Sequence, residues 1–130
     1  MVKSVTITLN VTDPTSGTYN LYALKRDWWK DYATWNNYGP GYKWEIPGAK
    51  GTLDRGTTVL GTITAPSIGK RTITLNAAGI ALVQSWVDDP STNDGIIIAD
   101  PSVSDGLVFD SRETSTASNR PKLTITYAAP

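Results

Sequence analysis

Residues 3–11 read KSVTITLNV, in which apolar and polar side chains alternate. One face of an extended chain would carry Val5, Ile7, Leu9 and Val11, and the other would carry Thr6, Thr8 and Asn10. This period of two predicts a half-buried β-strand. The turn residues Asp13–Gly17 follow, and a second strand is expected from Thr18 to Lys25. A short turn between two strands predicts a hairpin.

Beyond these two strands, further strands are expected at residues 57–63, 70–75, 95–99, 106–110 and 122–127. One helix interrupts them at about residues 77–87. Asn76 is its expected N-cap, and Asp88-Asp89-Pro90 should end it. Many short strands and a single helix predict an all-β fold, a jelly-roll-like antiparallel β-sandwich. The length of 130 residues fits one domain spanning residues 1–130.

Composition excludes several classes of function. Lys and Arg number 12, as do Asp and Glu, so no basic excess indicates a nucleic-acid partner. No apolar run is long enough for membrane insertion. The chain has no Cys and no His, so it lacks thiolate chemistry and the side chain most used as a general base and metal ligand. We expect a protein that is not an enzyme and needs no cofactor.

Residues 26–50 differ from the rest of the chain because Trp and Tyr are interleaved there with Gly, Pro and Asn. Long ordered loops in compact domains are often functional. Aromatic rings can stack on the C–H faces of sugars, while polar neighbours bind hydroxyls or carboxylates. The candidate ligand-binding residues are Lys25, Arg26, Trp29, Tyr32, Asn37, Tyr38, Tyr42 and Trp44. The alternative for these rings is packing in the core.

Two other groups of polar residues invite a functional interpretation. Asp88, Asp89, Asn93 and Asp94 bracket one loop and are calcium candidates, although a helix-end turn explains them more simply. The paired carboxylates of a glycosidase are not evident, because the chain has only Glu45 and Glu113 and most Asp residues lie in turn contexts.

Four motifs in order resemble the DNRLRE family, which includes the family 96 carbohydrate-binding modules and disaggregatase-related repeats. They are Trp28 with Thr34-Trp35-Asn36-Asn37; the segment from Ala77 to Trp86; Asn93-Asp94-Gly95-Ile96-Ile97-Ile98; and Phe109–Glu113 followed by Arg120–Tyr127. The resemblance spans residues 2–127. The chain departs from the family by lacking its first strands and by carrying Asn76 in place of Asp.

The resemblance implies an extracellular or cell-surface module that binds a polysaccharide, with an acidic polymer suggested by the Lys and Arg residues beside the aromatics. It also implies that Trp28 and Trp35 are scaffold residues of the core, and that Arg112 is a buried or rim ion-pair partner. Missing strands would leave sheet edges unpaired. The alternative function is therefore a self-assembling structural protein: a homo-oligomeric filament, surface-layer or virion decoration subunit whose neighbour supplies the strands.

Overall fold

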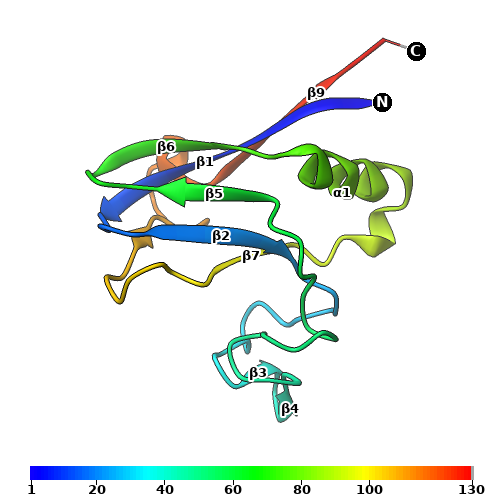
Figure 1. The fold of residues 1–130 in the computed structure, drawn as a ribbon, viewed down its shortest axis with the longest axis vertical. Helices are drawn as coiled ribbons and strands as arrows, with labels where there is room; N and C mark the ends of the chain where they lie inside the picture. Colours follow the sequence, from blue (N-terminus) through cyan, green and yellow to red (C-terminus); the bar gives the residue numbers. More distant parts are fainter. Residues whose placement is uncertain (130) are drawn as a thin grey trace.

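The computed structural model of the chain describes residues 1–129, and all its strands except β3 and β4 form two antiparallel sheets (Figure 1). In the first sheet, β1 (Val2–Asp13) pairs with β6 (Gly69–Thr74) on one side and with β8 (Val108–Phe109) and β9 (Lys122–Tyr127) on the other. In the second sheet, β2 (Thr18–Ala23) lies between β5 (Gly61–Thr64) and β7 (Ile96–Ala99). The expected all-β antiparallel fold is confirmed.

The core lies between the two sheets and is closed at one end by the helix. Both sheets and the helix contribute fully buried side chains, including Val5, Leu9, Leu21, Ile63, Ile73 and Val83. The alternation in residues 3–11 therefore has the predicted cause, because one face of β1 is turned to this core.

The helix α1 (Ala77–Asp88) ends within one residue of the bounds that the sequence predicts. The Asn76 side chain accepts a hydrogen bond from the Gly79 N–H at 3.1 Å, as an N-cap does. Asp89 ends the helix and caps the 3-10 turn η1 (Pro90–Thr92). Among residues 1–129, no helix combines the length and apolarity needed to cross a bilayer. A second 3-10 turn, η2 (Ala117–Asn119), precedes β9.

The predicted hairpin of the first two strands is wrong. β1 and β2 lie in different sheets, so the Asp13–Gly17 linker crosses from one layer to the other. β2 cannot pair with β1 because both edges of β1 are already taken by β6 on one side and by β8 and β9 on the other. The strand expected at residues 57–63 also begins later, at Gly61.

Residues 25–55, here called the 25–55 loop, leave the second sheet after β2 and project from the sandwich, at the bottom of Figure 1. Its two ends lie side by side. Leu24 forms an isolated antiparallel bridge with Arg55, and the Lys25 N–H donates to the Asp54 carbonyl at 2.8 Å. Within the loop, β3 (Asn37–Gly39) and β4 (Tyr42–Lys43) form a small hairpin. The predicted ligand-binding residues all lie in this loop.

Candidate functional site

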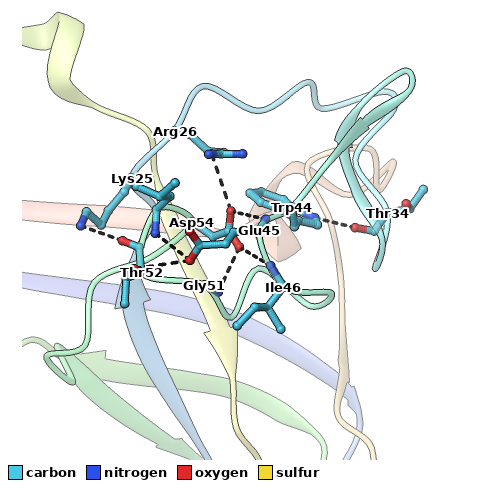
Figure 2. Close-up of polar contacts among 10 residues, drawn as sticks. Lys25, Arg26, Thr34, Trp44, Glu45, Ile46, Gly51, Thr52 and Asp54 are labelled. Carbon is cyan, nitrogen blue, oxygen red and sulfur yellow. Dashed lines mark hydrogen bonds and ion pairs between the residues drawn. The ribbon is translucent and has the colours of Figure 1, made fainter.

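A buried carboxylate organises the 25–55 loop. Asp54 has no solvent exposure, and its side chain accepts hydrogen bonds from three backbone N–H groups, those of Glu45, Ile46 and Gly51, at 3.0–3.2 Å (Figure 2). These N–H groups have no other strand or helix to pair with, so the carboxylate takes the place of secondary structure. Asp54 was not among the predicted site residues, because an Asp between Leu and Arg in a loop carries no distinctive pattern.

Arg26 connects this carboxylate to the aromatic rings. Its Nε lies 3.6 Å from Asp54 Oδ1, and its guanidinium carbon lies 4.6 Å from the centre of the Tyr38 ring. A guanidinium stacked on a ring gains a cation–π attraction as well as the ion pair. Arg26 is therefore held by Asp54 inside the loop and lies against the Tyr38 ring.

Five of the predicted residues form one contiguous group of rings, here called the aromatic cluster: Trp29, Tyr32, Tyr38, Tyr42 and Trp44. Tyr38 and Tyr42 stack with ring centres 5.7 Å apart and planes at 20°. The Trp29 ring packs edge-to-face with Tyr32, with ring centres 5.8 Å apart, and is tilted against Tyr42, with ring centres 5.9 Å apart. Such offset and edge-to-face contacts stabilise each pair beyond the area that they bury. The rings therefore form a fixed group.

The aromatic cluster has a buried base and an exposed surface. Trp44 is only 8% exposed, and its indole N–H donates to the Thr34 carbonyl at 2.9 Å. Trp29, Tyr32 and Tyr42 are 45%, 55% and 50% exposed. Trp44 thus anchors the group, while Trp29, Tyr32 and Tyr42 present about half of their surface to solvent.

The remaining two predicted residues lie at the edge of this group or away from it. The Lys25 ammonium donates to the Thr52 carbonyl at 2.8 Å, which turns this side chain toward the 44–55 segment (Figure 2). Asn37 lies in β3, and its backbone N–H donates to Thr34 Oγ1 at 3.1 Å.

The expectation that Trp28 and Trp35 belong to the core is wrong, because both are exposed, Trp35 by 64%. Trp28 links the loop to the segment that follows the helix, whereas Trp35 packs within the loop. The Trp28 indole donates to the Asp94 carbonyl at 2.6 Å. The Trp35 ring packs so closely on Gly48 that a Cβ there would lie 2.7 Å from it, and Gly48 also has a φ of 81° that favours glycine.

Of the two alternatives for Arg112, a buried or a rim ion-pair partner, the structure shows an exposed ion pair. Arg112 is largely exposed and pairs with its neighbour Glu113, which is equally exposed, so this pair contributes little stability. The buried arginine is Arg55, whose Nη2 lies 3.0 and 3.1 Å from the two carboxylate oxygens of Asp100. Burial acts to raise the pKa of Asp100, but hydrogen bonds from Arg55 and Tyr22 and the Arg55 charge outweigh it and lower that pKa.

Three of the four calcium candidates accept hydrogen bonds from residues nearby in the sequence. Asp88 accepts from Gln84, Asp89 caps η1, and Asn93 accepts from the Gly95 N–H. Burial and then the charge of Asp27 raise the pKa of Asp94. Within the described residues 1–129, no three carboxylate side chains converge on a point where a metal ion could sit.

Comparison with models of protein families, with curated proteins and with solved structures finds no match for this chain. The resemblance to the DNRLRE family therefore stays a prediction from the four motifs.

Proposed function

We propose that this protein binds a polysaccharide without catalysis, by stacking sugar rings on the exposed side of the aromatic cluster. The observation that carries the proposal is the partial exposure of Trp29, Tyr32 and Tyr42 in one contiguous group. Exposed apolar surface gathered in one place is typical of binding sites, whereas single exposed rings are ordinary.

The cluster is preorganised, which favours binding. Trp44 and the Asp54 hydrogen bonds fix the backbone beneath the rings, and Arg26 is held against Tyr38. A ligand that docks on fixed rings does not have to offset the entropy of ordering them.

Polar groups for sugar hydroxyls lie in the same surface. None of the hydrogen bonds found within residues 1–129 uses the phenol hydroxyls of Tyr32, Tyr38 or Tyr42, or the indole N–H of Trp29, whereas the indoles of Trp28 and Trp44 are both engaged. Free donors beside apolar ring faces suit a ligand that alternates C–H and O–H groups.

The charges near the cluster leave the polymer class open between neutral and acidic. Lys30 is paired with Asp31 at 3.2 Å, and Arg26 is paired with Asp54. Lys43 lies exposed on β4, beside Tyr42, and forms no ion pair within the described residues. A polysaccharide partner would place the working protein outside the cell or on its surface, and that location is part of the proposal.

Native electrophoresis through gels that contain xylan, alginate or pectin tests the proposal. We expect retardation in at least one gel and a loss of about tenfold in affinity for Trp29→Ala and Tyr42→Ala, which corresponds to about 1.4 kcal/mol of stacking. Both variants should keep the wild-type melting temperature within a few degrees, because these side chains are half exposed.

The matched control is Tyr127→Ala, which removes an equally exposed tyrosine from the end of β9. This variant should migrate like wild type in every gel. Absence of retardation in all three polymers, or equal effects of Trp29→Ala and Tyr127→Ala, would count against polysaccharide binding by the aromatic cluster.

A further inference from the structure

One side of the sandwich is open. The turn at residues 65–68 joins β5 to β6 and closes the layers on one side. On the opposite side, β7 ends the second sheet while β8 and β9 end the first; among the described residues no strand or helix lies between these edges, and residues 100–107 join them at the end of β7. We call this side the open margin. A cavity of about 730 Å³ lies there, lined by Ile96, Ile98, Leu107, Phe109, Trp28 and Trp35 among others.

The edge of β7 at the open margin has free backbone groups. The Leu24 N–H donates to the Gly95 carbonyl, which identifies residues 24 and 95 as a hydrogen-bonded antiparallel pair. Pairs alternate along such a ladder, so Ile97 and Ala99 direct their backbone groups to β2. The N–H and C=O groups of Ile96 and Ile98 therefore point away from β2, to the outside.

Within residues 1–129 no strand pairs with the outer edge of β7, and residues of the 25–55 loop line the cavity beside it. Natural edge strands are guarded by Lys, Pro, bulges or covering loops. β7 reads Ile-Ile-Ile-Ala and pairs with β2 in unbroken register. The first sheet adds exposed apolar surface beside it, because Leu123 of β9 lies on the core face opposite Ile7 and is still 45% exposed.

We propose that the open margin is a homodimer interface, in which β7 of two copies pair antiparallel around a two-fold axis. The second sheets would then form one continuous six-stranded sheet, and each copy would cover the other's cavity. An antiparallel edge pairs with its own copy in this way without any further segment, because a two-fold interface is self-complementary. Because the net charge is zero, two copies do not repel each other through their overall charge.

The apolar area at the margin is of the size that a dimer needs. The exposed fractions of Trp28, Trp35 and Leu123, with the partly buried residues of β7 and β8, amount to roughly 500 Å² per copy if an aromatic side chain contributes about 150–250 Å². Two copies would bury about 1,000 Å², the lower bound for a specific interface, before the backbone contacts are added. The one carboxylate in the lining, that of Asp100, is already paired with Arg55.

Sedimentation equilibrium from low to high micromolar concentration tests the proposal. We expect twice the chain mass of 14.0 kDa for wild type. Ile97→Lys and Leu123→Lys, which place a charge on the two edges of the margin, should sediment as monomers. The matched control Ile68→Lys alters an exposed isoleucine in the β5–β6 turn on the closed side and should remain dimeric.

Hydrogen exchange of the wild-type protein gives a second readout that does not depend on how the variants fold. The amides of Ile96 and Ile98 should become protected as concentration rises, whereas those of Ile97 and Ala99 should be protected at all concentrations. A monomeric wild-type protein throughout the concentration range would overturn the proposal. So would a dimer that the Ile97 and Leu123 variants leave intact, or amides of Ile96 and Ile98 that exchange at a rate independent of concentration.

Discussion

At the residue scale, Asp54 has the largest effect on the candidate site although it does not reach the surface. Its carboxylate satisfies the N–H groups of Glu45, Ile46 and Gly51 and faces Arg26. Asp54→Asn replaces one acceptor oxygen by an NH₂ group that confronts backbone donors, and it removes the ion pair. We expect a loss of about 3 kcal/mol in the free energy of unfolding, measured by urea denaturation.

The control for this prediction is Asp31→Asn, which alters an exposed carboxylate of the same loop and should cost about 0.5 kcal/mol or less. Asp54→Asn should also weaken polysaccharide retardation, because Arg26 and the backbone under Trp44 lose their support. Equal stabilities of the two variants would show that Asp54 does not organise the loop.

Individual residues also show where sequence reasoning reached its limit. The segment rich in Trp and Tyr was recognised from composition, but which rings are exposed was not. Trp44 is buried with its indole bonded to the Thr34 carbonyl, and Trp35 is exposed with its ring against Gly48. Both arrangements depend on the folded loop. The motif points to Arg112, whereas nothing near Arg55 in the sequence indicates its ion pair, because Asp100 is 45 residues away.

At the scale of elements, the Arg55–Asp100 pair fastens the end of β7 to the base of the 25–55 loop. The folded state lowers the pKa of Asp100 below its ordinary 3.8. A lowered carboxyl pKa contributes stability that is present above the unfolded value and lost as pH falls through the folded one. Asp100→Asn should therefore be less stable than wild type at pH 7, and the difference should vanish as pH falls below 3.8.

Thermal melts of both proteins from pH 7 down to acid measure this difference. The double variant Arg55→Gln with Asp100→Asn should lose beyond the single variant only the stacking of Arg55 on Tyr22, because the ion pair is already absent in both. A gap between wild type and Asp100→Asn that stays constant with pH would assign the effect of the substitution to packing instead of charge.

Strands and helices that follow from local sequence patterns are predictable, whereas the pairing of the strands is not. A few neighbouring residues are enough to show the alternation in β1 and β9 and the Asn76 cap of α1. The pairing of β1 with β6, β8 and β9 depends on residues about 60 to 125 positions away. Because these strands fill both edges of β1, β2 pairs in the other sheet. A turn of suitable residues is compatible with a hairpin and with a crossing between layers.

At the scale of the whole molecule, the structure divides into a sandwich that folds around its own core and a loop that carries the candidate site. No residue of the 25–55 loop belongs to the main buried core, and the loop's buried residues, such as Trp44 and Asp54, form a small centre of their own. The ends of the loop are already paired through Leu24 and Arg55. The loop is therefore an insertion between two adjacent strand ends.

This division predicts that the loop can be removed. Replacing residues 26–53 by Asn-Gly would join Lys25 to Asp54, which are hydrogen-bonded neighbours, through a turn suited to a two-residue hairpin. We expect a shortened chain that melts cooperatively with the far-ultraviolet spectrum of a β-protein, at a lower temperature because the contact of Trp28 with Asp94 is gone. It should show no retardation in any polysaccharide gel. A chain that fails to fold would mean that the loop and the sandwich form one cooperative unit, whereas retained retardation would place sugar binding outside the aromatic cluster.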